Sequence, residues 1–136
     1  AMPYTLIDQR SLHRGMAALQ KRGVSVIIGA PFASGILVTG SSGPAHYAYG
    51  KAPPEIQARV RGIEAACARH KVLLPAAALQ FVLAHPIVVS VIPGAARASE
   101  VAANVASLGA DIPAAFWAEL KAEKLIDPDS PVPAGK

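Results

Sequence analysis

The sequence has few of the residues on which several common classes of protein depend. Its one cysteine, Cys67, excludes an internal disulfide, and we expect it to be a small buried residue on a helix. Aromatic residues make up only 5% of the chain. Because the basic side chains are not interleaved with aromatic ones, we expect no nucleic-acid partner. No group of His, Cys, Asp and Glu has the spacing of metal ligands, so we predict no metal site.

The sequence also lacks an unbroken apolar run that could cross a membrane. The most suggestive stretch, Val72–Pro93, is interrupted by Pro75, Gln80, His85 and Pro86, whereas a spanning helix needs about 20 consecutive apolar residues. No signal peptide is recognisable at the start. We therefore expect a cytoplasmic protein with no membrane partner.

The length and composition admit two interpretations. The chain has 136 residues, enough for one modest domain but fewer than the roughly 250 of a complete (βα)₈ barrel. Hydrophobic residues make up 52% of it. They can belong to buried parallel strands, which read as continuous apolar runs, or to a fragment whose surface faces a missing partner.

The formal net charge of +4 favours anionic ligands.

Apolar periodicity predicts an alternation of strands and helices. The predicted strands are Tyr4–Ile7, Val24–Ile28 and Ile87–Ile92. The predicted helices are Ser11–Arg22, Glu55–Lys71, Pro75–His85, Ser99–Leu108 and Ala114–Leu125. This order implies a parallel sheet with right-handed crossovers, and three strands cannot close a barrel. We expect a single partial domain over residues 1–126 and a flexible Pro-rich tail over residues 127–136.

Two loops that follow predicted strands are candidates for function. After the last strand, the chain turns at Gly94 and begins a helix, whose unpaired N–H groups would suit a phosphate; a plain strand-to-helix turn is the alternative. In the loop 40–54, His46, Tyr47 and Tyr49 could line a substrate pocket or form only a loop tip.

Four segments, taken together, resemble the aldo/keto reductase family. Ile92–Gly94, with Asn104 ten residues beyond, resembles the last βα unit of that family, and Gly29–Leu37 resembles the loop after its strand seven. Ala77–Leu83 resembles the helix before strand eight, and Tyr4–Gln9 the end of strand six. The segments occur in the family's order and cover essentially the whole chain, with most similarity to the NAD-using fucose, galactose and pyridoxal dehydrogenases.

The resemblance implies an α/β fold, the C-terminal half of a (βα)₈ TIM barrel with about three parallel strands and flanking helices. It also implies a nicotinamide dinucleotide cofactor, NAD with NADP possible. The residues that would contact this cofactor are Pro31, Phe32, Ser34, Ile92, Gly94, Ala95, Arg97, Glu100 and Asn104.

Several positions carry specific expectations from the resemblance. Ser34 would lie along the cofactor pyrophosphate, and Asn104 matches an Asn that contacts adenine. Glu100 stands where NADP-preferring members carry an Arg, which favours NAD. Ala103 replaces a Glu common in the family, and Gly29 replaces an aromatic residue that stacks on nicotinamide in many members.

The family's catalytic Asp, Tyr, Lys and His belong to the first half of its barrel, and no residue of this chain has the matching context. We therefore predict no catalytic residues. Two hypotheses follow. The chain is the cofactor half of a truncated sugar or aldehyde oxidoreductase, inactive alone, or it is a non-enzymatic interaction module. In the second case its exposed barrel surface would pair with itself, as a homo-oligomer, or with another protein, such as a missing N-terminal half.

Overall fold

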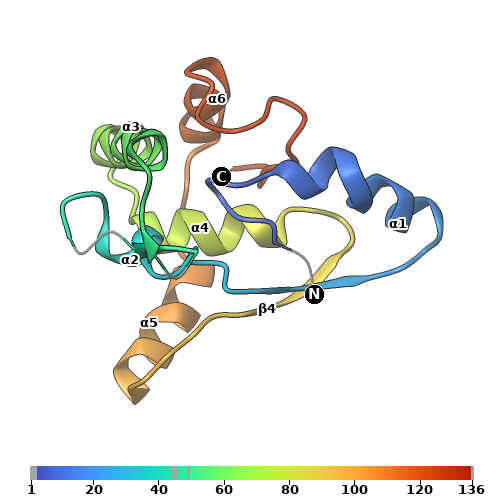
Figure 1. Ribbon diagram of the computed structural model, residues 1–136, viewed down its shortest axis with the longest axis horizontal. Helices are drawn as coiled ribbons and strands as arrows, with labels where there is room; N and C mark the ends of the chain where they lie inside the picture. Colours follow the sequence, from blue (N-terminus) through green and yellow to red (C-terminus); the bar gives the residue numbers. More distant parts are fainter. Residues whose placement is uncertain (1–2, 44–45, 49, 136) are drawn as a thin grey trace.

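Strands and helices alternate along most of the computed structural model (Figure 1), which describes residues 3–43, 46–48 and 50–135. The elements are the π-helix η1 (Leu12–Met16), α1 (Ala17–Lys21), β1 (Val26–Gly29), α2 (Ile36–Thr39), β2 (His46–Tyr47), β3 (Gly50–Lys51), α3 (Pro54–His70), α4 (Leu74–Leu83), β4 (Val88–Ile92), α5 (Ala98–Leu108) and α6 (Ala114–Ala122).

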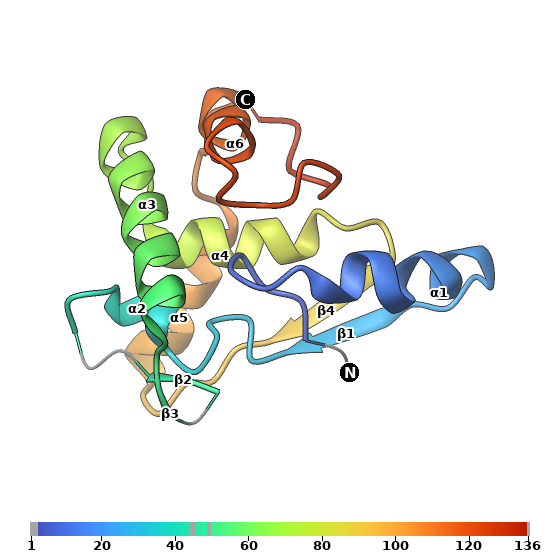
Figure 2. The same ribbon diagram turned by 45° about the horizontal axis from the view of Figure 1, so that its top comes forward.

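The two longer strands, β1 and β4, form a parallel pair, as the alternation predicts. Ile28 lies opposite Val91 and Gly29 opposite Ile92, with an irregularity after Val26. Helices α1 and α4 lie along one side of this pair (Figure 2). On that side Val26 and Ile28 are buried, because side chains of a strand alternate between its two faces.

The opposite face of the strand pair is apolar and open to solvent. Ile27, Val89 and Ile92 are 44%, 63% and 61% exposed. In a complete (βα)₈ barrel, this inner face is filled by layers of side chains from all eight strands. The exposure of these three side chains agrees with the expectation that a partial barrel leaves strand residues without their packing partners.

The prediction of a strand over Tyr4–Ile7 is wrong. The segment forms a tight turn, in which the N–H groups of Thr5 and Asp8 each donate to the other residue's carbonyl, over 2.9 and 3.1 Å. Tyr4 and Ile7 are nevertheless buried. The apolar run thus belongs to the core, but its hydrogen bonds close locally instead of onto a neighbouring strand.

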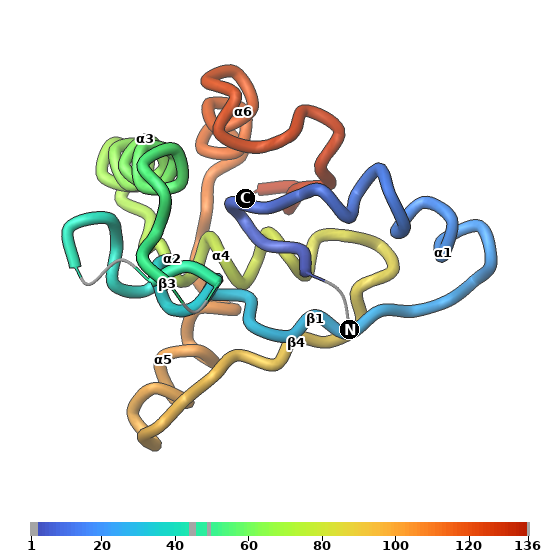
Figure 3. The backbone as a smooth tube through the Cα atoms, in the orientation of Figure 1, coloured from blue at the N-terminus to red at the C-terminus, as the bar shows by residue number. Residues whose placement is uncertain are grey.

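Aromatic side chains on the helical side join the two ends of the chain. Tyr4 stacks on Phe81 with ring centroids 5.2 Å apart, and Phe116 meets Trp117 edge to face at 4.9 Å. Figure 3 shows the first segment passing beside the last one, where Gln9 accepts a hydrogen bond of 3.2 Å from the N–H of Asp127. The core therefore depends on residues from α4, α6 and both ends.

The single cysteine is buried, as predicted. Cys67 lies on the inner face of α3 and is 5% exposed. Burial raises the pKa of its thiol to about 11, because the apolar surroundings disfavour the charged thiolate.

Other predicted segments match the structure to different degrees. The helices predicted over 55–71 and 99–108 are confirmed within one residue at each end. The loop 40–54 contains a short antiparallel pair, β2 and β3, that was not predicted. Residues 127–135 of the tail have no helix or strand, but Ser130 is buried among them. Its flexibility stays a prediction. Within the described residues, no helix is long and apolar enough to span a membrane.

Candidate functional site

A pocket of about 710 Å³ is lined by the loop after β1, helix α2, the start of α4 and helix α5. Figure 1 shows how these elements are arranged. The walls of the pocket include Phe32 and Ser34 from the first loop, Gly94 from the loop after β4, and Glu100 and Asn104 from α5. Parallel strands bring their carboxyl ends to one edge, and ligands of parallel α/β proteins bind there.

The loop after β1 is held in an uncommon backbone conformation. Ala30, Ala33 and Ser34 have φ angles of 52°, 49° and 61°, and Gly35 has 94°. The left-handed region disfavours residues with a Cβ, and each such residue costs on the order of 1–3 kcal/mol. Strain of this kind gathers at ligand-binding sites, and alternation with right-handed residues can form a concavity of N–H groups that binds anions. The exposed Ser34 side chain lines the pocket at this loop.

Glu100 links the loop after β4 to the start of α5 through hydrogen bonds. Its carboxylate accepts hydrogen bonds from the N–H of Ala96 at 2.7 Å and from the guanidinium of Arg97 at 2.8 and 3.1 Å. The bond from Ala96 first, and then Arg97, lowers the pKa of Glu100. The pocket therefore carries an ionised carboxylate at neutral pH.

The pocket wall formed by α5 is anchored to α4. The Gln80 side-chain amide donates to the carbonyls of Ser107 and Ala110, over 2.9 and 2.8 Å. In the loop that leads into α5, Gly94 is open, since a Cβ built there meets no atom within 4 Å. Gly94 is thus not required by the packing of the chain, and its lack of a side chain leaves room for a ligand.

The structure brings together five of the nine predicted cofactor residues and leaves four outside the pocket lining. Pro31 is buried, Ile92 lies on the open sheet face, and Ala95 and Arg97 are exposed. Sequence reasoning did not single out Val38, Thr39 and Leu73, which also line the pocket. Helix α2, which carries the first two, has only four residues and no apolar period that could have revealed it.

Whether His46, Tyr47 and Tyr49 line a substrate pocket stays a prediction. Tyr47 points its hydroxyl at the Asp8 carboxylate at 3.5 Å, and burial raises the pKa of that hydroxyl. Tyr49 lies outside the described residues.

The predicted absence of a metal stays a prediction. Among the described residues, His13, Asp127 and Asp129 bring potential ligand atoms within 4.8 Å of one another. All three stand at least partly open to solvent, where such groups are common without an ion.

Two curated relatives are similar to nearly the whole chain. It is 37% identical over 123 residues to a pyridoxal 4-dehydrogenase from Microbacterium luteolum, covering 90% of this chain and 36% of that protein. It is 35% identical over 124 residues to a D-threo-aldose 1-dehydrogenase from a Pseudomonas species, covering 90% and 38%. The chain thus spans well under half the length of these relatives.

Solved structures show the same relation in three dimensions. An aldo-keto reductase from Bacillus halodurans matches 98% of this chain with 44% of its own length in the apo form, at a TM-score of 0.70 and 25% identity. Its holo form matches at a TM-score of 0.71 and 26% identity. The fold is therefore a partial (βα)₈ barrel. Since the model of the Aldo/keto reductase family matches residues 1–124, the chain belongs to that family.

Proposed function

We propose that this chain is the cofactor-binding C-terminal part of an NAD(P)-dependent aldo/keto reductase that acts on a sugar or an aldehyde in the cytoplasm, and that it is inactive alone. One observation carries the proposal: Ser34 from the loop after β1 lines a single pocket with Gly94, about 60 positions later, and with Asn104 on α5. Its volume lies in the range of roughly 300–1,000 Å³ that is usual for ligand sites.

The chemistry of the pocket fits a dinucleotide. The strained loop and the Ser34 hydroxyl suit the pyrophosphate, since both can donate hydrogen bonds to anionic oxygens. The Asn104 amide can pair with the adenine edge. Glu100 already accepts from Ala96 and Arg97, but a carboxylate has about four acceptor positions and can still accept from a ribose hydroxyl. The bound cofactor would supply the hydride chemistry, and these residues would bind and orient it.

The experiment that tests cofactor binding replaces Gly94 by alanine. No atom of the chain lies within 4 Å of the added Cβ, so the melting temperature should stay unchanged. A dinucleotide packed on this backbone would meet the methyl group, and we expect calorimetry to show at least a roughly tenfold lower affinity for NAD, equivalent to about 1.4 kcal/mol.

The matched control is Gly50→Ala, on strand β3, where the added Cβ makes only ordinary contact, at 3.9 Å from the Tyr47 carbonyl oxygen. This variant should bind NAD like the wild type. Equal affinities for all three proteins, or no NAD binding by the wild type, would contradict the proposal.

We further expect the isolated chain to show no NAD(P)-dependent oxidation of sugars and no reduction of aldehydes. The reason is the missing proton donor, since hydride transfer to a carbonyl requires a positioned acid. The measurement is absorbance at 340 nm with protein purified from a host that lacks its own reductases. Turnover clearly above that of a boiled sample would show that this half carries a catalytic site after all.

A second candidate function is that of an interaction module. The open sheet face with Ile27, Val89 and Ile92 favours it, because monomeric proteins rarely leave large contiguous apolar patches exposed. The partner would be a second copy or the N-terminal half of a barrel. Cofactor binding and pairing are compatible, and they are tested separately.

A further inference from the structure

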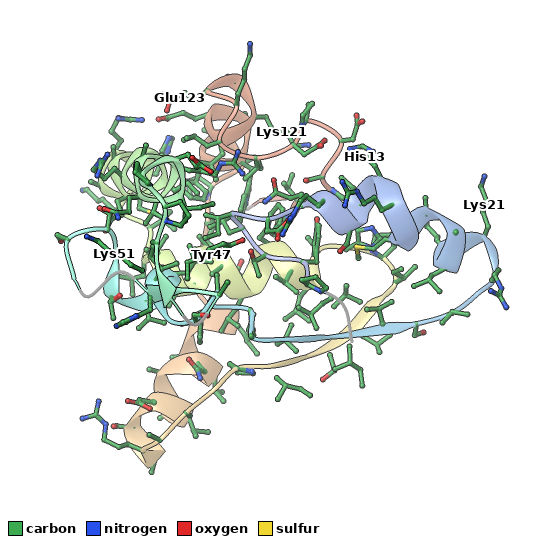
Figure 4. All side chains as sticks on the ribbon, in the orientation of Figure 1. His13, Lys21, Tyr47, Lys51, Lys121 and Glu123 are labelled. Atoms are coloured by element: carbon green, nitrogen blue, oxygen red, sulfur yellow. The ribbon has the colours of Figure 1, made fainter. Side chains whose placement is uncertain are left out.

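A second groove, of about 700 Å³, shares no lining residue with the dinucleotide pocket. It lies between the segment leading into η1, helix α3 and the stretch that follows α6. Figure 4 shows His13 on η1 and Lys121 on α6, which belong to its two sides. Six basic side chains line it: Arg10, His13, Arg14, Arg59, Lys121 and Lys124.

The walls of this groove are held together by hydrogen bonds between distant segments. The buried Gln9 side chain donates to the Thr5 carbonyl at 2.7 Å and accepts from the N–H of Asp127 at 3.2 Å. The Arg59 guanidinium donates to the Ile7 carbonyl at 3.0 Å. These bonds hold the backbone segments of the groove together and fix the position of the Arg59 guanidinium.

The charge of the groove is compensated only in part. Asp127 is the one acid among the lining residues and is paired with His13 at 2.8 Å, and Arg10 is paired with Asp8, which is not a lining residue, at 2.6 Å. Within the described part of the chain, Arg14, Lys121 and Lys124 have no carboxylate within ion-pair distance. Cations gathered in a concave site repel one another, and they raise the local concentration of anions.

The backbone at Lys124 makes this residue a useful position for a test. Helix α6 ends at Ala122 and its closing turn reaches Lys124, with the N–H of Leu125 bonded to the Leu120 carbonyl at 2.9 Å and a φ of 57° at Lys124. Glycine is the residue favoured at such a left-handed helix end. Lys71 has a similar φ of 55° at the end of α3, so the chain tolerates lysine in this conformation, and glycine at position 124 should relieve strain.

We propose that this groove binds a small organic anion with two or more phosphate groups. Its volume suits a small molecule, and guanidinium and ammonium groups on three sides match separated phosphates. Apolar surface from Leu125 and Ile126 in the lining can contact a carbon skeleton. The inference concerns a different surface from the dinucleotide pocket and does not rest on the proposed function.

The test is calorimetric titration of the full chain with fructose 1,6-bisphosphate as the probe, and with inorganic phosphate for comparison. We expect saturable binding of the bisphosphate, much weaker binding of phosphate, and affinity that falls as salt is added, because exposed charges are screened. Lys124→Gly should lower the affinity about fivefold to tenfold while raising the melting temperature, since it removes both a cation and the strain.

Two controls make the result decisive. Lys21→Glu changes a lysine at the far end of α1 (Figure 4) that does not line the groove, and Gly94→Ala alters only the dinucleotide pocket. Both should bind the bisphosphate like the wild type. The proposal is overturned if the wild type shows no saturable binding, if Lys124→Gly binds as well as the wild type, or if either control loses affinity to the same extent.

Discussion

Replacing Glu100 by arginine should shift the nucleotide preference of the chain from NAD to NADP. In the wild type, the ionised carboxylate lines the dinucleotide pocket and would repel a 2′-phosphate. Juxtaposed like charges cost on the order of a few kcal/mol. We expect the ratio of the NAD and NADP dissociation constants to change by about a hundredfold, which corresponds to about 2.7 kcal/mol.

The contacts of Glu100 should make the change in the NAD-to-NADP binding ratio larger than a single charge reversal would. Its carboxylate pairs with the Arg97 guanidinium, so Glu100→Arg would both add a cation and free an existing one. Calorimetry with each dinucleotide on the isolated chain measures the binding ratio. The same substitution in a complete barrel, restored with an N-terminal half, extends the measurement to turnover.

The control for this prediction is Glu100→Gln. Glu100 sits in the first turn of α5 and fixes the preceding loop by accepting from the N–H of Ala96, so a merely structural role is the competing explanation. Glutamine keeps an acceptor at this position but removes the charge, and we expect an intermediate preference at an unchanged melting temperature. A wild type that already binds NADP as well as NAD would show that Glu100 does not discriminate between them.

We expect the wild-type chain to self-associate through its open sheet face, and Ile27→Asp combined with Val89→Asp to abolish this. The two side chains are 44% and 63% exposed, and burial of each would contribute roughly 1.5–3 kcal/mol. Exposed strand edges add unpaired N–H and C=O groups that favour such pairing. A loss of about 2.7 kcal/mol already weakens association a hundredfold.

Sedimentation velocity over a range of concentrations measures this effect. The wild type should shift from monomer to dimer as concentration rises, and the double variant should stay monomeric with a similar melting temperature, because neither side chain is part of the core. Val38→Asp, at 51% exposure on α2, is the matched control and should associate like the wild type. A wild type that sediments as one monomeric species, with a melt independent of concentration, would exclude self-pairing.

Local sequence signals account for the elements that were predicted well. Helix α3 begins at Pro54 and keeps Val60, Ile63 and Cys67 on its buried face, so its period and its start are both visible in the sequence. Strand β4 has four β-branched residues among its five and stops before Pro93, which removes the next backbone donor.

Features that depend on distant partners could not be predicted. Tyr4–Ile7 has the composition of a strand, but its hydrogen bonds close within a turn. The lining of the pocket could likewise be predicted only in part. The order of the motifs indicated Ser34, Glu100 and Asn104, but no local pattern indicates that Leu73, between α3 and α4, also lines the pocket. The basic groove joins residues more than 100 positions apart, a proximity that no sequence spacing reveals.

The burial of Cys67 makes this chain a convenient scaffold for site-specific labels. With a pKa of about 11, only about one thiol in a thousand is a thiolate at pH 8, and the thiolate is the species that reacts with maleimides. A fluorophore or spin label would therefore attach almost exclusively to a cysteine introduced elsewhere, such as one at the exposed Val38, without removal of the native residue. Two such labels, placed outside the pairing face, would report the distance between paired copies.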